Sequence, residues 1–288
     1  MSKLSAFFIN PMLNKEIKLR FRSFKSFLGL FFYLAVLGAA ALGFIYIETG
    51  FGMDFFRAED SRILFIVLSM GQLGLILFMT PGLTAGIISS EREKQTLNIL
   101  LTTEQSSLSV ILSKLISSLA FLILMVFASL PLYSIVFLYG GVSPNLVFIT
   151  FGIYLVTMLA VGSLGIMLST LLRKTMTATI TTYGITAVVV LGIVFLFLLF
   201  QEVMFGYIPG QQSPTETPLP YLLMMLNPPA VLVSVLEPGF EQEFLRNSSI
   251  KLPLTTGFVI TYLSVSVITL AVSIKKLRPS MKKGRKKA

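Results

Sequence analysis

The sequence predicts an all-α integral membrane protein with six transmembrane helices. Of its 288 residues, 55% are hydrophobic and only 12% are charged, whereas a soluble domain carries about 25% charged residues. The mean hydropathy is +0.85. Six apolar runs each reach the ~20 residues that a helix needs to cross a bilayer. These runs lie at 27–47, 63–88, 108–139, 146–172, 176–200 and 253–274. We therefore expect residues 1–288 to form a single transmembrane domain.

Ahead of the first run, residues 10–26 predict an amphipathic helix that lies in the membrane interface. Apolar residues recur at helical spacing along one stripe: Leu13, Ile17, Phe21, Phe24 and Leu28. A second stripe is basic and consists of Lys15, Lys18, Arg22 and Lys25. Asn10 can cap the helix, and Pro11 suits its first turn. Such a helix either only anchors the chain or is an elbow that contacts a cytoplasmic partner.

The basic residues predict the orientation of the spans. An even number of spans puts both termini on one side, together with residues 89–107 and 173–175. Nineteen of the 23 Lys and Arg residues fall on that side, which the positive-inside rule makes cytoplasmic. The net charge of +10 therefore indicates anionic lipid headgroups as a partner, and no nucleic acid, because the charges are juxtamembrane. The tail at 275–288, "KKLRPSMKKGRKKA", is the clearest case.

Between the second and third runs, residues 89–103 read "SSEREKQTLNILLTT" and predict a short cytoplasmic helix. Ser90 and Glu93 have the spacing of a capping box. Three leucines fall on one face of the helix: Leu97, Leu100 and Leu101. Charged residues crowd its start: Glu91, Arg92, Glu93 and Lys94. The helix is either a docking segment for another protein or a solvated connection between spans.

The fifth run opens with threonine residues in "KTMTATITTYGIT". Thr179, Thr182 and Thr186 either line a transport pathway or only bond the carbonyl groups of their own helix, as threonine hydroxyls commonly do.

Residues 201–252, on the outer side, contain an apolar stretch that prolines interrupt. Non-helical backbone at membrane depth survives only where it is buried in protein or faces water. We therefore expect short helices that dip into the outer leaflet and break at Asn227, Pro228 and Pro229. The alternative is a pair of interfacial helices without a role in transport.

Several kinds of chemistry are missing from the sequence. The chain has no Cys and no His, which excludes thiol catalysis, disulfides, imidazole bases and zinc sites of the usual kinds. It has no Gly-x-x-x-x-Gly-Lys-Ser/Thr phosphate loop. We therefore expect no catalytic residue, no metal site and no cofactor on this chain. An ion-coupled carrier usually needs a carboxylate within a span, and the acidic residues here sit at span ends.

Residues 87–116, "IISSEREKQTLNILLTTEQSSLSVILSKLI", resemble the signature of ABC-2 type transporter permeases. In that family a Glu-rich segment leads to Thr-Leu-x-x-Leu-Leu-x-Thr, and a Lys opens the third span. A Pro usually follows the Thr pair, where this chain has Glu104 and Gln105. The "LNPP" at 226–229 also resembles the last outer loop of the family.

The resemblance implies a plasma-membrane exporter of bacterial type, with an amphiphilic, lipid, peptide or drug-like cargo. Two permease subunits, identical or homologous, would pair with two cytoplasmic ABC ATPase subunits that bind ATP and Mg²⁺. Residues 89–103 would be the coupling helix. Its leucines would pack into the ATPase or against the elbow helix, and its charged residues would supply polar contacts. A self-contained secondary carrier and a non-transporting scaffold or sensor are the alternatives, which a neighbouring gene with a phosphate loop would disfavour.

Overall fold

The structure is a computed structural model that describes residues 11–49, 58–96, 106–205, 218–237, 239–242 and 248–277. Nearly all of these residues are helical, and they form no β-strand. Six helical segments in this part of the chain are long and apolar enough to cross a membrane. The predicted all-α fold with six spans is therefore confirmed.

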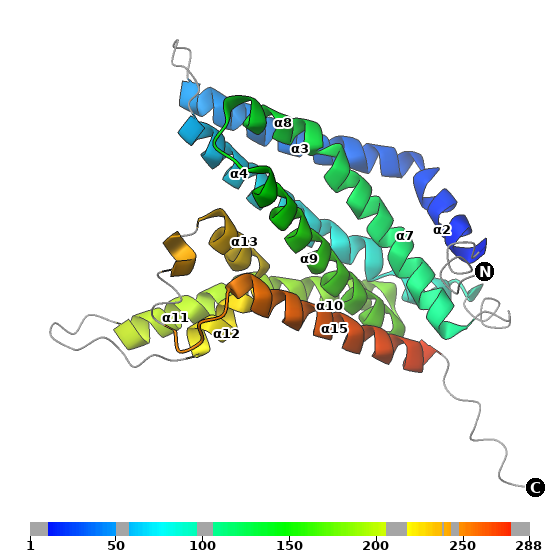
Figure 1. Ribbon diagram of the computed structural model, residues 1–288. Helices are drawn as coiled ribbons and strands as arrows, with labels where there is room; N and C mark the ends of the chain where they lie inside the picture. The colour runs from blue at the N-terminus through cyan, green and yellow to red at the C-terminus, as the bar shows by residue number, and fades with distance from the viewer. Residues whose placement is uncertain are drawn as a thin grey trace, which may run out of the picture.

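All six spans begin and end within five residues of the apolar runs in the sequence, and two of them contain a break. The spans are α3 (Phe24–Thr49), α4 (Ala58–Thr84), α7 and α8 (Ser107–Ala128 and Leu130–Tyr139), α9 (Pro144–Leu171), α10, η1 and α11 (Thr175–Ala187, Val188–Gly192 and Ile193–Phe205), and α15 (Leu254–Leu277). The shorter helices are α2 (Pro11–Phe21), α5 (Ile87–Glu93), α12 (Leu219–Met225) and α13 (Pro228–Leu236). Figure 1 shows α2 and the C-terminal end of α15 at one end of the molecule, away from α12 and α13.

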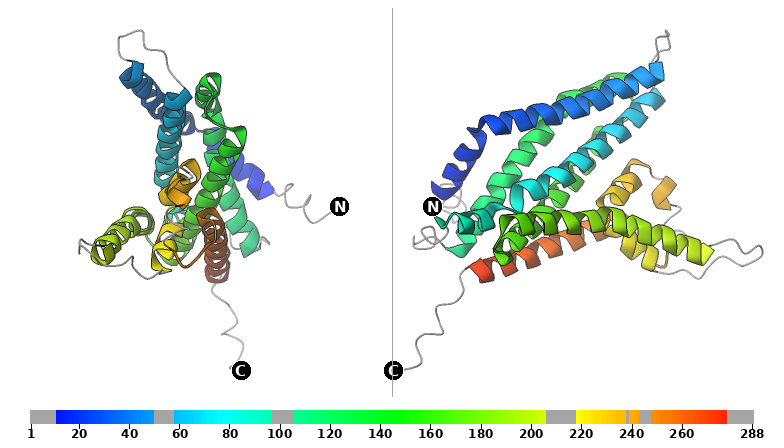
Figure 2. Two further views of the ribbon diagram at one scale, coloured as in Figure 1. Left: turned by 60° about the vertical axis from the view of Figure 1, so that its left-hand side comes forward. Right: turned by 180° about the vertical axis from the view of Figure 1, so that it is seen from behind.

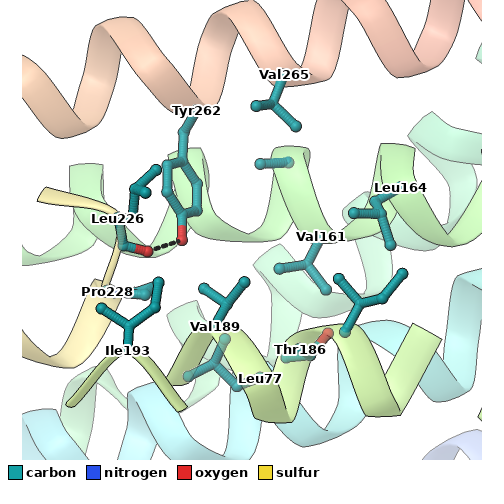
Figure 3. A pocket seen from close by; sticks show the side chains of 12 residues that line it. Leu77, Val161, Leu164, Thr186, Val189, Ile193, Leu226, Pro228, Tyr262 and Val265 are labelled. Carbon is teal, nitrogen blue, oxygen red and sulfur yellow. Dashed lines mark hydrogen bonds between the residues drawn. The ribbon is translucent and has the colours of Figure 1, made fainter. Parts of the chain in front are cut away.

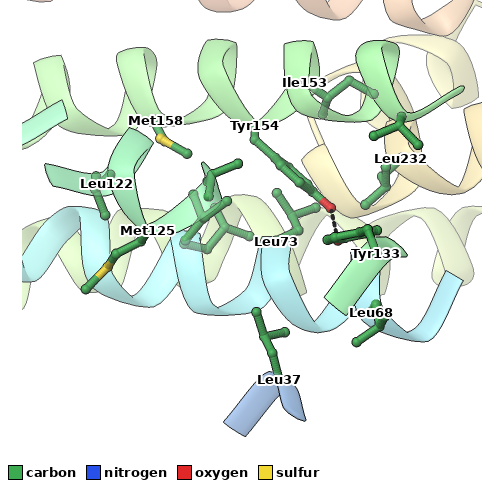
Figure 4. Packing of buried hydrophobic residues seen from close by; sticks show 14 of the residues in the cluster. Leu37, Leu68, Leu73, Leu122, Met125, Tyr133, Ile153, Tyr154, Met158 and Leu232 are labelled. Atoms are coloured by element: carbon green, nitrogen blue, oxygen red, sulfur yellow. Dashed lines mark hydrogen bonds between the residues drawn. The ribbon is translucent and has the colours of Figure 1, made fainter. Parts of the chain in front are cut away.

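Helix α9 is the central element, because it packs against α4, α7, α10, α13 and α15. Half of the most apolar stretch of α9 is buried inside the chain, whereas only 17% of the corresponding stretch is buried in the first and fifth spans. The peripheral position of α3 and of α10–α11 is visible in Figure 2. The main apolar core lies between α9 and α4 and includes Leu73, Leu122 and Met158, which Figure 4 shows.

A polar cluster lies within this apolar core. The Tyr133 hydroxyl donates to Gln72 Oε1 at 2.5 Å, and the Tyr154 hydroxyl donates to the carbonyl oxygen of Ser69 at 2.9 Å. The two hydroxyl oxygens are 3.5 Å apart (Figure 4). Side-chain hydrogen bonds between spans hold membrane helices together, so the cluster links the second, third and fourth spans.

Local sequence explains where several helices begin and end. Ser106 caps α7, since its side chain accepts from the amide of Ser109, and Ser143 caps α9 in the same way ahead of Pro144. The third apolar run is two helices, because the chain bends at Ser129, two residues before a proline that lacks an N–H. Gly140 ends α8 with a φ of +79°, a conformation that favours glycine.

The amphipathic segment ahead of the first span forms α2, which ends at Phe21 rather than continuing to residue 26. The chain bends there, and the Ser26 hydroxyl donates to the carbonyl oxygen of Arg20 at 2.6 Å across the bend. Phe24 and Leu28 therefore belong to the first span, where both are exposed. Asn10, the expected cap, lies outside the described residues.

Candidate functional site at the α5 segment

Helix α5 follows the second span after a turn at Ala85 and Gly86. The free amides at its N-terminal end are capped by a side chain of another span. The residue before the helix, Gly86, has no side chain to accept from the free amides of the first turn. Instead, the amides of Ile88 and Ser89 donate to Ser169 Oγ of α9, at 2.9 and 3.0 Å. This bond joins the start of α5 to the fourth span.

The predicted capping box at Ser90 and Glu93 is wrong. Ser90 lies inside α5, and its hydroxyl donates to the carbonyl oxygen of Ile87 at 3.4 Å. The helix starts four residues earlier than the capping-box spacing implies, because the apolar Ile87 and Ile88 continue the helical path and Ser169 supplies the cap from α9.

Arg92 on α5 binds the last carbonyl groups at the C-terminal end of α9. Its guanidinium donates to the carbonyl oxygens of Thr170 and Leu172, at 2.9 and 3.2 Å. The last carbonyl groups of a helix have no partner within it, and a basic side chain at that position is favourable. Arg92 therefore fastens α5 to the C-terminal end of the fourth span.

Glu93 in turn caps the fifth span. Its two carboxylate oxygens accept from the amide and the hydroxyl of Thr175, at 2.9 and 2.7 Å. Lys174, which precedes α10, provides no side-chain cap. The hydrogen bonds from Thr175, first from its hydroxyl and then from its amide, lower the pKa of the exposed Glu93 carboxyl. Glu93 thus remains ionised at the start of α10, where a negative charge is favoured.

Helix α5 is also connected to α7 through Lys114, which lies in the first half of α7. Lys114 Nζ lies 2.5 Å from Glu91 Oε1 of α5 and 3.1 Å from Glu16 Oε1 of α2. The lysine side chain is only 3% exposed, while each glutamate side chain is 26% exposed. A buried charge requires such partners. Lys114 therefore holds α2 and α5 together against the third span.

Helix α2 has a further contact at this end of the molecule. Arg20 donates from its guanidinium to the carbonyl oxygen of Leu83, at the end of α4, at 3.4 Å. Burial lowers the pKa of Arg20, and the charge of Glu16 opposes that shift. The rings of Phe21 and Phe121 meet edge to face, with centroids 6.0 Å apart. Helix α2 is thus packed against α7 and bonded to the end of α4.

Helix α5 ends at Glu93, and its C-cap residue, Lys94, is exposed. Gln95 follows with a φ of +59°, in the left-handed region, and its amide donates to the carbonyl oxygen of Arg92 at 3.1 Å. The Thr96 hydroxyl donates back to the carbonyl oxygen of Glu91 at 3.2 Å. The three leucines of the predicted apolar stripe, Leu97, Leu100 and Leu101, lie outside the described residues.

A second group of predicted residues surrounds the sharp bend between α12 and α13. Helices α12 and α13 meet at 97°. Asn227 caps α13, because its Oδ1 accepts from the amide of Ala230, and Pro228 and Pro229 form the first turn of α13. Asn227 Nδ2 also donates to the carbonyl oxygens of Val189 and Val190, at 2.9 and 2.7 Å. Both carbonyls belong to the π-helix η1 of the fifth span, a helix type that often marks functional sites.

Two of the three candidate threonines of the fifth span bond within their own helix. The hydroxyls of Thr182 and Thr186 donate to the carbonyl oxygens of Ala178 and Thr182, at 2.7 and 2.9 Å. Thr182 is fully buried, and Thr179 is half-buried. Thr186 borders a cavity of about 140 Å³ between the second, fourth, fifth and sixth spans and the bend (Figure 3).

Sequence reasoning singled out neither Ser169 nor Glu16, the partner of Lys114 on α2. Ser169 and the amides that it caps are about 80 positions apart in the chain, so no local pattern identifies them. The charged residues at the start of 89–103 could be found from the sequence. Three of the four, Glu91, Arg92 and Glu93, bond α5 to other helices.

The comparisons with known proteins agree with this architecture. A family model described as "ABC-2 family transporter protein" matches residues 12–274. The matched range includes the first five spans, nearly all of the sixth, α5 and the bent pair of helices. No curated protein matches the chain.

Proposed function

The chain belongs to the ABC-2 family of transporter proteins, and from this premise we propose that it is the permease of an ATP-driven exporter. Membership makes it a multi-pass membrane subunit of an ABC transporter and not itself the ATPase. In our proposal, separate cytoplasmic ABC subunits bind ATP and Mg²⁺ and hydrolyse the nucleotide. The permease converts their movement into a rearrangement of its spans.

The observation that carries this proposal is the way α5 is fastened. Its start is bonded to α9 through Ser169, its end to α9 and α10 through Arg92 and Glu93, and its middle to α7 and α2 through Lys114. Coupling between distant sites needs a contiguous network of contacts. A displacement of α5 acts at once on the third, fourth and fifth spans and on α2.

The segment that follows α5 is the proposed docking surface for the ATPase. Leu97, Leu100 and Leu101 provide the apolar contact, and the exposed Lys94 provides a charge beside it. Glu91, Arg92 and Glu93 already have partners within the chain. In the proposal, their role is therefore to fasten α5 to the spans, and contact with the ATPase falls to the residues beyond them.

The orientation in the proposal places α2, α5 and both termini in the cytoplasm of a bacterial cell, with the spans in the cell membrane. The positive-inside bias of the sequence supports this orientation. The basic residues at 275–288 then lie beside anionic lipid headgroups.

A second permease subunit, identical or homologous, completes the proposed transporter. The first and fifth spans support this part of the proposal, because only 17% of their most apolar stretches is buried within the chain, against 50% for the second and fourth spans. Residues such as Phe31 of α3 and Leu191 of η1 are more than half exposed and are available to lipid or to a second copy.

The cargo that fits best is an amphiphilic molecule, a lipid, a peptide or a drug-like compound. The described spans carry acidic residues only near their ends, so a secondary carrier that binds an ion at mid-membrane lacks the usual carboxylate. This favours the ATP-driven exporter over the self-contained carrier.

Reconstitution tests the proposal. The permease is purified alone and together with its cognate ATPase subunit, in proteoliposomes that contain a fluorescent amphiphile. We expect ATP turnover and ATP-dependent movement of the amphiphile only when both subunits are present. Transport by the permease without an ATPase would support the carrier, and ATPase binding without transport of any of the cargo classes would support the scaffold.

A further inference from the structure

The cavity beside the bend has walls from four spans and from the junction of α12 and α13. Twelve residues line it, and they include Ile185, Thr186, Val189, Leu226, Tyr262 and Val265. Ten of them are labelled in Figure 3, where their side chains surround one space. Ile185 is also exposed on the surface of the chain, so the cavity reaches the outside of α10.

The polar groups around the cavity already have partners. The Tyr262 hydroxyl donates to the carbonyl oxygen of Leu226 at 2.8 Å (Figure 3), and the Thr186 hydroxyl donates to the carbonyl oxygen of Thr182 at 2.9 Å. The carbonyl oxygen of Val189 in the π-helix accepts from Asn227. The rest of the cavity wall consists of aliphatic side chains and the ring of Tyr262.

These properties decide what the cavity can hold. Its volume is about 140 Å³, which is more than one water molecule needs. A buried water also requires two to four polar partners, and the polar groups around this cavity are already bonded. An engineered apolar cavity of about 150 Å³ in another protein stays dry and binds benzene or xenon. The spans that form the walls here are surrounded by the hydrocarbon of a bilayer.

We propose that this cavity is a binding site for a hydrocarbon chain, and that the bend at Asn227 and Tyr262 forms its outer end. The chain is either an acyl chain of a bilayer phospholipid or the apolar part of a single-chain amphiphile. The site lies within one permease subunit, so the proposal does not depend on the ATPase partner proposed above.

Photolabelling in nanodiscs tests the site. One sample contains phospholipid with a diazirine in the middle of an acyl chain, and another contains unlabelled phospholipid with a photoreactive single-chain amphiphile. The readout is labelled peptide mapped by mass spectrometry. Label on Tyr262, which is 7% exposed, reports entry into the cavity, while label on Ile268 of the same helix, which is 60% exposed, reports surrounding lipid.

Two pairs of valines provide matched variants. Val265→Phe on α15 and Val189→Phe on η1 fill the cavity from different helices. Val267→Phe and Val188→Phe make the same change at exposed positions close by, since these valines are 67% and 65% exposed. Monodisperse elution and an unchanged label on Ile268 show that a variant has kept its fold.

We expect label on Tyr262 in the parent from at least one probe, a severalfold loss of that label in both filling variants, and no loss in the exposed-site variants. Label from the phospholipid identifies a bilayer lipid as the occupant, and label from the single-chain probe alone identifies a free amphiphile. The proposal is overturned if both probes label Ile268 but not Tyr262, or if the filling variants leave the Tyr262 label unchanged.

Discussion

Lys114 Nζ of the third span lies 2.5 Å from Glu91 Oε1 of α5, and the same nitrogen contacts Glu16 of α2. Replacing Lys114 with Met keeps an unbranched side chain, one atom shorter and without the charge, and leaves two carboxylates without their partner. Removal of one member of a buried ion pair costs about 3–5 kcal/mol. We expect a loss toward the lower end of that range, because each glutamate side chain is 26% exposed. The measurement is thermal unfolding of the purified protein in detergent.

The control for this prediction is a triple variant, Glu16→Gln, Glu91→Gln and Lys114→Met, which removes all three charges. It recovers most of the lost stability if the unpaired charges are the cause. Lys275→Met changes an exposed lysine at the end of α15 and has little effect. Equal melting temperatures for Lys114→Met and Lys275→Met would contradict the role of Lys114.

Ser169→Ala removes the oxygen that caps α5. The amides of Ile88 and Ser89 then lose their acceptor, at a cost of about 0.5–2 kcal/mol, as for other helix caps. We expect faster hydrogen exchange in the peptide that covers α5, while α9 itself is unchanged. Ser134→Ala, at an exposed serine that bonds only the carbonyl oxygen of Pro131 in its own helix, is the matched control. Identical exchange of α5 in the two variants would show that Ser169 does not hold it.

Asn227 has two roles that a pair of substitutions separates. Asp is as good a helix cap as Asn but cannot donate to the carbonyl oxygens of Val189 and Val190, and it places a buried charge against them. We expect Asn227→Asp to lower the melting temperature more than Asn227→Ala does. If capping of α13 were the only role of Asn227, the Asp variant would unfold like the parent.

The orientation of the chain is tested with reporters. A reporter fused after Ala288 reads cytoplasmic, and one inserted near Ser213 reads exterior, because the positive-inside rule sets the topology. Phosphatase and fluorescent-protein fusions at each point give opposite signals and control for expression. The reverse pattern would overturn the six-span orientation.

Apolar run length predicted the spans, because about 20 apolar residues suffice to specify a membrane helix whatever it packs against. The bend at Ser129 also has a local cause in the nearby proline. The π-helix in the fifth span has no such cause in its own sequence. Its carbonyl groups are bonded by Asn227, 37 and 38 positions further along the chain.

The candidate site likewise combines features that the local sequence predicts with features that depend on how distant segments pack. The charges in 89–103 indicated a functional segment, but their partners depend on how the spans pack. The capping-box prediction used only the spacing of Ser90 and Glu93, whereas the actual cap comes from Ser169 and Glu93 caps a different helix. Caps that one helix provides to another cannot be read from a window of sequence, because the fold brings them together.

The central claim is that residues 89–103 connect the permease to an ATPase, and one measurement tests it most directly. Leu97 and Leu101 are both replaced with Asp, and the variant is co-purified with the cognate ATPase subunit, whose ATP turnover is then measured. Leu252→Asp, at an exposed position just before α15, is the control. Burial of a leucine contributes about 1.5–3 kcal/mol, so the account predicts loss of ATPase binding and of permease-dependent turnover, with the variant inserted and monodisperse. A double-Asp variant that binds the ATPase and supports turnover like the parent would contradict the account.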